Sequence, residues 1–336
     1  MRVVASNFSA PLPVSDDYEA LWASTAIPDC PRRASLFEQP FMWGFHITAL
    51  GVYLMDCGRA QRVELWDYQP RRRMRYTPGG ALEVHFHNAA DVAAYLDRTG
   101  PPDLIVNFGF RGLPVLRMLE GRSFRVHVPT LRAPTDPLEH AECFLLDAQD
   151  QLVERSMLYI PVVNTEVVRP RPAAPERDFV YLATCYAGKR HDLLVDAVRG
   201  TELTGHLHPV PANALDLTRT RITTSDWDER DVVDLLQTSR IAVYPGDHTS
   251  NPAAMWECVA AGLPIVVNDA IEGGRHVVVP GVTGELASEE RFLEVMRAVL
   301  TDRPHYSPRE HFLAHWDTVT LLERYLAFFR RMGWTG

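Results

Sequence analysis

Two charged residues in this chain have the type and setting that phosphate and hydroxyl binding would need. Lys189 is the single lysine among 34 basic residues, and it follows Gly188 shortly after the apolar run 179–182. An ammonium is a compact charge that approaches phosphate oxygens from several directions. Glu257 lies among apolar residues, where a buried carboxylate without a partner is costly. Both are candidates for ligand binding, and the alternatives are an exposed turn lysine and a solvated helix face.

The segment that carries Glu257 has the order strand, loop, helix, strand. Residues 241–245 are apolar and end in a proline, which predicts a buried strand, and 263–267 predict a second one. A helix is predicted over 253–261, with Pro252 in its first turn.

The loop 246–251 that precedes this helix is a candidate anion site. Ser250 or Asn251 is the expected N-cap. The first N–H groups of the helix, including those of Ala253 and Ala254, have no partner within the helix and point at the loop together with the helix dipole.

Strands and helices alternate along the rest of the chain, which predicts parallel sheets with ligands at the carboxyl ends of the strands. The sequence predicts further strands at 2–8, 62–66, 103–108, 123–128, 179–186 and 221–224, and helices at 44–58, 89–99, 113–119, 192–199, 229–238, 291–300 and 315–331. Residues 10–40 are expected to form a long loop with a short helix near 17–23, and the basic run 71–75 to form a solvated loop. The Pro-rich tract 169–175 is expected to be a stiff linker.

Composition excludes several classes of protein. A chain of 336 residues is long enough for two domains, and a net charge of −9 argues against binding to nucleic acid or to a membrane surface. The five cysteines have no metal-ligand or disulfide spacing, and the histidines are dispersed, so we expect no metal site and a cytoplasmic setting. No run approaches a membrane span, so no stable membrane insertion is expected.

The pattern P-x11-E from Pro245 to Glu257, followed by A-x-G-x-P-I-V-V over 260–267, resembles the donor-binding stretch of a large family of retaining glycosyltransferases. This is the GT-B family that includes sucrose synthases and bacterial mannosyltransferases. The resemblance implies an α/β fold with two Rossmann-like, doubly wound parallel-sheet domains that face a central cleft. It also implies that residues 160–166 form the hinge strand. The expected division is an acceptor domain at 1–168, a nucleotide-sugar domain at 176–312, and a helix at 313–336 that crosses back to the first domain.

The resemblance also assigns roles to individual residues. Glu257 would bind the ribose hydroxyls, and Lys189 and the start of the helix would hold the diphosphate. The family has a second glutamate where this chain has Thr249. The candidates for donor binding are Glu257, Gly188, Lys189, Arg190, Gly246, His248, Thr249, Ser250, Asn251, Ala253, Ala254 and Thr223.

Further candidates would act on the sugar or on the acceptor. The catalytic candidates are Lys189, Asp247 and His127, and the acceptor candidates are Gly44, Trp43, Phe41, His46 and Asn107. Structural alternatives stand beside them: an Asx-type turn at Asp247 and His248, a plain turn at Gly44, and satisfied core polar groups at His127 and Asn107.

The sequence therefore predicts a retaining, metal-independent glycosyltransferase without a bound cofactor. Its donor would be a UDP- or GDP-linked sugar, and its acceptor a small soluble molecule such as a natural-product intermediate. The alternatives are a GT-B epimerase that acts on a nucleotide sugar without an acceptor, and a non-catalytic subunit that only binds nucleotide sugar. The oligomeric state is left open.

Overall fold

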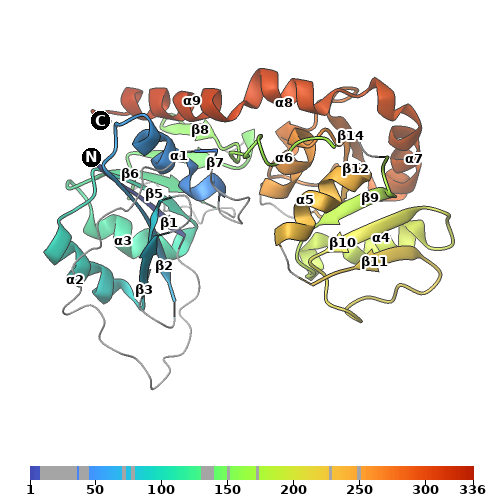
Figure 1. The fold of residues 1–336 in the computed structure, drawn as a ribbon, viewed down its shortest axis with the longest axis horizontal. Helices are drawn as coiled ribbons and strands as arrows, with labels where there is room; N and C mark the ends of the chain where they lie inside the picture. The colour runs from blue at the N-terminus through green and yellow to red at the C-terminus, as the bar shows by residue number, and fades with distance from the viewer. Residues whose placement is uncertain are drawn as a thin grey trace. The chain divides into compact units, whose positions relative to one another are not determined.

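The computed structural model divides into two compact units. The first comprises Met1–Leu146, Asp150–Tyr159 and Leu322–Gly336, and the second comprises Asp147–Gln149 and Ile160–Leu321 (Figure 1). The predicted helix near 17–23 lies outside the residues that the structure describes. These are residues 1–7, 36–37, 45–69, 73–76, 80–129, 140–149, 152–171, 174–226, 229–247 and 251–336.

The first unit is built on an eight-stranded sheet with the order β3-β4-β2-β1-β5-β6-β7-β8. All neighbouring strands are parallel except β3 and β4. The strands are β1 (Arg2–Asn7), β2 (Arg62–Tyr68), β3 (Arg73–Tyr76), β4 (Leu82–Phe86), β5 (Leu104–Phe108), β6 (Phe124–Val128), β7 (Cys143–Leu146) and β8 (Ser156–Leu158). The helices are α1 (Phe45–Asp56), α2 (Ala89–Thr99) and α3 (Leu113–Met118).

Local sequence explains where two of these helices lie. Helix α2 begins where the Asn88 side chain accepts hydrogen bonds from the N–H groups of Ala90 and Asp91, and it ends at Gly100 with φ 74°. Helix α1 is buried on nearly all sides. A Cβ at Gly51 would lie 2.6 Å from a methyl carbon of Val63, so glycine allows this helix to approach the sheet closely.

The core of the first unit contains three aromatic rings in edge-to-face contact. Trp66, Phe86 and Tyr95 are nearly or fully buried, and their ring centroids lie 5.3 to 5.9 Å apart. Such pairs add to the free energy gained from burying apolar area. The carboxyl-terminal part of the chain also packs in this unit. The Tyr325 ring stacks on the Tyr159 ring, and the ring centroids of Phe329 and Phe124 lie 6.1 Å apart.

The basic run 71–75 was expected to be a solvated loop, and this prediction is wrong for its described part. Residues Arg73–Tyr76 form β3, antiparallel to β4, with Met74 opposite Val84. Alternation of side chains along the strand turns Met74 toward the core, where it packs against the buried cluster.

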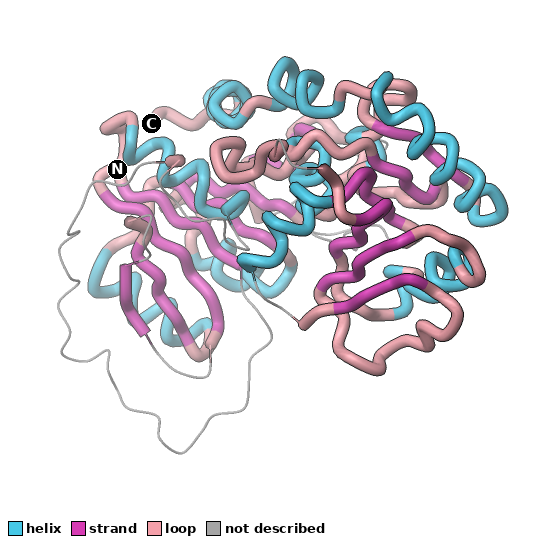
Figure 2. Tube along the Cα trace, turned by 45° about the vertical axis from the view of Figure 1, so that its right-hand side comes forward, coloured by secondary structure: helices cyan, strands magenta, loops and turns pink. Residues whose placement is uncertain are grey.

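The second unit contains a six-stranded, wholly parallel sheet with the order β11-β10-β9-β12-β13-β14 (Figure 2). The strands are β9 (Arg177–Leu182), β10 (Thr204–His208), β11 (Arg221–Thr224), β12 (Ser239–Tyr244), β13 (Ile265–Asn268) and β14 (Gly284–Ala287). The helices are α4 (His191–Val198), α5 (Glu229–Thr238), α6 (Ala253–Ala260), α7 (Phe292–Asp302) and α8 (Pro308–Trp316). The last helix, α9 (Thr318–Arg331), begins in this unit with residues 318–321 and continues in the first unit.

Residues 160–166 were expected to form a strand, and they do not. The Val163 and Thr165 carbonyls, and that of the following Val168, accept hydrogen bonds from side chains rather than from a neighbouring strand. The hydroxyl of Thr318 donates to the Val163 carbonyl at 2.6 Å, and the guanidinium of Arg309 donates to the carbonyls of Thr165 and Val168 at 3.2 and 2.8 Å. Side-chain donors thus take the place of a strand partner for these buried carbonyl groups.

Candidate functional site

Two loops of the second unit meet at the carboxyl ends of β9 and β12. These strands are parallel neighbours, with Phe179 opposite Ile241, so their following loops emerge at the same edge of the sheet. A Cβ at Gly246 would lie 3.0 Å from the Gly188 carbonyl oxygen and 3.3 Å from the Cα of Lys189. Glycine at 246 therefore lets the two main chains touch, and it brings three of the predicted donor residues together.

Lys189 ends a short 3-10 turn, η4 (Ala187–Lys189), in the loop after β9. Its main-chain carbonyl accepts a hydrogen bond of 2.7 Å from the hydroxyl of Tyr181. Its ammonium nitrogen lies 5.5 Å from the centroid of the Tyr186 ring. Partial burial lowers the pKa of the ammonium, and no carboxylate among the described residues is paired with it. The lysine thus carries a partly desolvated charge that an anionic ligand would stabilise.

Arg190 and Asp247 are brought together as well, in an arrangement that the sequence did not indicate. Arg190 has a left-handed backbone, with φ 48°, and its guanidinium pairs with both carboxylate oxygens of Glu289. Asp247 lies 3.4 Å and Asp192 3.7 Å from the same guanidinium. Glu289 was missed because it lies about a hundred residues further along the chain, beyond β14, and no local pattern connects it to Arg190.

Glu257 lies in α6, and its side chain is partly exposed. The surrounding protein removes water from the carboxyl group and raises its pKa to about 7. None of the described residues donates a hydrogen bond to it or forms an ion pair with it. The adjacent Cys258 and Tyr244 are both buried. The Tyr244 hydroxyl oxygen lies 3.4 Å from the Cys258 sulfur, within hydrogen-bonding distance. The carboxylate is therefore placed in a low-dielectric setting in which donors from a ligand would bind strongly.

The start of α6 differs from the prediction. The N-cap is Pro252, which offers no capping side chain, and the prediction of a capping Ser250 or Asn251 is wrong for Asn251. The amide oxygen of Asn251 instead accepts a 2.7 Å hydrogen bond from the indole N–H of Trp256. The first-turn N–H groups of Ala253 and Ala254 thus have no capping side chain from Pro252 or Asn251. His248, Thr249 and Ser250 lie outside the described residues.

Asp147 is a further acidic residue beside this helix, and no sequence pattern indicated it. Its carboxyl group is buried, accepts a hydrogen bond from the N–H of Asn251, and has a pKa raised to about 7 by burial. Its main-chain carbonyl accepts from the N–H of Gly274 at 3.1 Å. Asp147, in the segment between β7 and β8, thus holds Asn251, which lies two residues before the start of α6. This contact is tertiary, so no spacing in the sequence could have shown it.

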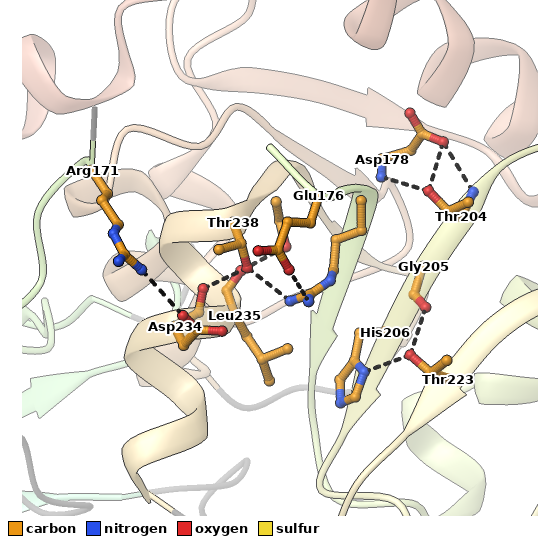
Figure 3. Close-up of polar contacts among 12 residues, drawn as sticks. Arg171, Glu176, Asp178, Thr204, Gly205, His206, Thr223, Asp234, Leu235 and Thr238 are labelled. Carbon is orange, nitrogen blue, oxygen red and sulfur yellow. Dashed lines mark hydrogen bonds and ion pairs between the residues drawn. The ribbon is translucent and has the colours of Figure 1, made fainter. Parts of the chain in front are cut away.

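Thr223 lies elsewhere on the same sheet. Its hydroxyl donates to the Gly205 carbonyl at 3.3 Å and lies 2.7 Å from Nδ1 of His206, which is opposite it on the neighbouring strand (Figure 3). The other ring nitrogen of His206 lies 2.9 Å from the hydroxyl of Ser225. Thr223 is therefore part of a polar group at β10 and β11, and no described contact joins it to Lys189 or Glu257.

The candidates in the first unit form a separate group at the ends of β1, β5 and β6. Asn107 lies opposite Ser6 and His127 in the two registers. The hydroxyl of Ser6 donates to the Asn107 amide oxygen at 2.9 Å, and the Asn107 amide nitrogen lies 3.1 Å from Nδ1 of His127. All three side chains are fully buried, and burial lowers the pKa of His127 to about 4, so the ring is neutral at pH 7. Asn107 thus bonds to both of its neighbours within the core, which is the structural alternative that the sequence left open for it.

His46 lies near this group, at the start of α1. Its ring is 6.0 Å from that of Phe108 in an edge-to-face contact, and burial lowers its pKa to about 4. Phe41, Trp43 and Gly44, the other acceptor candidates, lie outside the described residues.

Among the residues that the structure describes, no three histidine, cysteine, aspartate or glutamate side chains gather closely enough to hold a metal ion. Within those same stretches, no helix has the length and apolar character needed to cross a membrane.

Comparison with known proteins agrees with this arrangement. Residues 212–312 match the family model described as Glycosyl transferases group 1, and no curated protein sequence matches the chain. A sucrose-phosphate synthase from Thermosynechococcus elongatus is similar in structure, with 11% identity, a TM-score of 0.72 and 98% of each chain covered.

Two other solved structures are similar over almost their whole length. Alr3699/HepE from Anabaena, in complex with UDP and glucose, has 12% identity and a TM-score of 0.66, with 98% of this chain and 100% of that chain covered. AviGT4, a glycosyltransferase involved in avilamycin A biosynthesis, has 16% identity and a TM-score of 0.64, with 98% and 97% covered. Residues 212–312 thus match the family of group 1 glycosyl transferases, and the chain as a whole has the GT-B fold of the glycosyltransferases to which it is similar.

Proposed function

We propose that this protein transfers a sugar from a nucleoside diphosphate sugar to a small soluble acceptor, with retention of the anomeric configuration. The observation that carries the proposal is the contact between the Lys189 loop and Gly246 at the edge of the sheet from which the Glu257 helix also begins. A partly desolvated ammonium without a described carboxylate partner suits a diphosphate. The similar Anabaena protein was solved in complex with UDP-glucose, which supports a donor of this class.

In this proposal each part of the donor has its own partner. Lys189 and the N–H groups of Ala253 and Ala254 bind the diphosphate, and the Glu257 carboxylate accepts hydrogen bonds from the two ribose hydroxyls. These cationic and N–H groups are fixed before the bond breaks, so they stabilise the charge that develops on the leaving diphosphate without reorganising. We propose that this fixed set of donors acts without a resident metal or cofactor.

Asp247 is the candidate that would contact the sugar. Its carboxylate is held by Arg190, which is also paired with Glu289. This pairing involves Oδ2 of Asp247 and leaves its other carboxylate oxygen, Oδ1, for a sugar hydroxyl. The pairing also limits the orientations of the Asp247 side chain toward the sugar. Arg190 would therefore act on the donor through Asp247 as well as through its own charge.

The acceptor is proposed to bind to the first unit. His46, which is less buried than Asn107 and His127, is the described side chain that would touch it, with Asn107 and His127 holding the strand ends in place. Involvement of the similar AviGT4 in avilamycin A biosynthesis agrees with a natural-product acceptor. An acceptor that lies against the His46 ring would be a small ring-bearing molecule, because aromatic faces bury much apolar area with few polar contacts.

The test begins with calorimetry of the full chain against UDP, GDP and ADP, followed by turnover with the sugar-linked form of the best binder. Appearance of a glycosylated acceptor with the donor's anomeric configuration, seen by NMR, would support the proposal. Conversion of the donor sugar without acceptor would favour the epimerase instead. Binding without donor consumption would favour the non-catalytic subunit, and failure of all three nucleotides to bind would overturn the donor site.

A further inference from the structure

The main chain of Lys189 is held by a hydrogen bond from a buried tyrosine of the sheet. Tyr181 lies on β9, one residue before the strand ends, and is 1% exposed. Its hydroxyl donates to the Lys189 carbonyl at 2.7 Å, across eight residues of chain. This distance is typical of an O–H···O hydrogen bond, and the low dielectric around the buried Tyr181 strengthens it.

The phenol ring of Tyr181 is itself fixed on two sides. The His191 ring lies 4.7 Å from it, and Nε2 of His191 is 3.2 Å from the Ala183 carbonyl oxygen. The Tyr244 ring, on the neighbouring strand β12, contacts it edge to face at 5.4 Å. Because the ring is held in one orientation, the hydroxyl of Tyr181 points at the Lys189 carbonyl.

The same short turn is bounded on its other side by Gly246. The Gly188 carbonyl oxygen and the Cα of Lys189 lie so close to Gly246 that a Cβ there would meet them at 3.0 and 3.3 Å. The turn also closes on itself through a hydrogen bond of 2.9 Å from the Lys189 N–H to the Tyr186 carbonyl. The main chain of Lys189 is thus held by three contacts, to Tyr181, Gly246 and Tyr186. Its long side chain is flexible by nature.

We propose that Tyr181 is a positioning residue for the transfer reaction: its hydroxyl fixes the Lys189 backbone so that the ammonium meets the diphosphate as it leaves. The inference rests on the proposed role of Lys189. A cation that must stabilise developing charge contributes most when its position is set before the reaction, and small displacements reduce that contribution. Tyr181 would therefore affect the transition state more than the bound donor.

The variant Tyr181→Phe removes the hydroxyl and keeps the ring, and Tyr306→Phe is a matched control. Tyr306 also lies in the second unit, and its hydroxyl donates a hydrogen bond of 2.9 Å to Glu285, with no described contact to the Lys189 turn. We expect Tyr181→Phe to lower kcat by roughly 10-fold with the donor KM changed less than about 3-fold. Tyr306→Phe should keep kcat within about 2-fold, although it also loses one tyrosine hydrogen bond.

A double-mutant cycle with Lys189→Ala separates positioning from general loosening of the fold. If Tyr181 acts through Lys189, Tyr181→Phe lowers kcat in the wild-type background and has no further effect on the Lys189→Ala enzyme. Gly246→Ala, which pushes the same turn from the other side, should show the same dependence on Lys189. This second variant keeps the test decisive where Tyr181→Phe fails to fold.

The outcomes separate the inference from the proposed function. Wild-type kcat in Lys189→Ala would overturn the role of Lys189 itself. An impaired Lys189→Ala enzyme combined with equal kcat values for Tyr181→Phe and Tyr306→Phe would overturn only the positioning role of Tyr181. An effect of Tyr181→Phe that persists undiminished in the Lys189→Ala background would overturn it as well.

Discussion

Both units carry polar side chains near the carboxyl ends of their central strands, but these side chains are bonded in opposite ways. In the first unit Ser6, Asn107 and His127 are fully buried and bonded to one another. In the second unit neither the Lys189 ammonium nor the Glu257 carboxylate has a hydrogen-bond or ion-pair partner among the described residues, and the pKa of each is shifted by loss of water. Desolvated polar groups without partners cost free energy, so we propose that this second pair is arranged to bind a ligand.

The comparison separates candidates that the sequence treated alike. A histidine and an asparagine at strand ends suggest a site just as a lysine and a glutamate do. Only the contacts show that Asn107 and His127 bond to each other, while Lys189 and Glu257 have no hydrogen-bond or ion-pair partner within the described chain. The predictions below test whether this difference in bonding is a difference in function.

The largest effect is expected from Lys189→Ala. Removing one preorganised charge from the leaving diphosphate should lower kcat by roughly 100-fold or more, while donor binding weakens less. Lys189→Arg should restore part of the rate, because the planar guanidinium carries the charge but not the compact shape. Steady-state kinetics with the donor found by calorimetry measure both. Full turnover in the alanine variant would mean that another cation performs this role.

The next largest effect is expected from Glu257→Ala on nucleotide affinity. Two hydrogen bonds to a carboxylate would be lost, which should cost on the order of 3 kcal/mol and raise the dissociation constant about 100-fold. Calorimetry gives this constant directly. The control is circular dichroism of the variant, which should be unchanged because the Glu257 side chain is partly exposed at the surface of α6. An unchanged affinity in the folded variant would remove the ribose role.

A smaller and graded effect is expected from pH. The free Glu257 carboxyl has a pKa of about 7, and ribose hydroxyls would donate to its ionised form, so binding favours loss of the proton. Nucleotide affinity should therefore rise with pH below about 7, by up to roughly tenfold per unit, and level off above it.

Asp147 also has a raised pKa of about 7, and the nucleotide phosphate titrates nearby, so the control is Glu257→Gln. This variant keeps both of those titrations and removes the one at 257. Calorimetry at a series of pH values should show a weaker pH dependence for the variant. Identical slopes for the two proteins would assign the effect to Asp147 or to the phosphate.

The opposite pattern is expected for His127→Ala. Removing the ring leaves the buried Asn107 amide without one of its contacts, so stability should fall by about 1–3 kcal/mol. Nucleotide affinity should stay within about twofold, because the second unit alone is proposed to hold the donor. Thermal denaturation and calorimetry together test this. A large loss of nucleotide affinity with normal stability would contradict the comparison between the two groups.

Much of the fold followed from local sequence signals. Helix α5 was predicted over its full extent, 229–238, and α2 over 89–99, because strong apolar periodicity and, for α2, the capping Asn88 fix their ends. The pairing of a Gly-Lys loop with a strand, loop and helix also predicted that Gly188, Lys189 and Gly246 lie together, whereas Thr223 lies apart from them.

Other features required the tertiary structure. Strand β10 was missed because Gly205 and two histidines weaken its apolar pattern, although burial between β9 and β11 makes it a central strand. The strand expected at 160–166 failed because Arg309 and Thr318, far along the chain, bond its carbonyl groups. Asp147 and Glu289 reach the site from distant segments, and no local spacing predicts such contacts.

The most direct test of the donor site compares UDP or GDP, whichever binds more tightly, with its 2′,3′-dideoxy form, on the wild-type protein and on Glu257→Gln. Calorimetry supplies four dissociation constants. If Glu257 binds the ribose, removing both hydroxyls should weaken binding to the wild-type protein by roughly 10- to 100-fold, and it should have little effect on the variant. Equal losses in both proteins would place the ribose away from Glu257 and contradict the account.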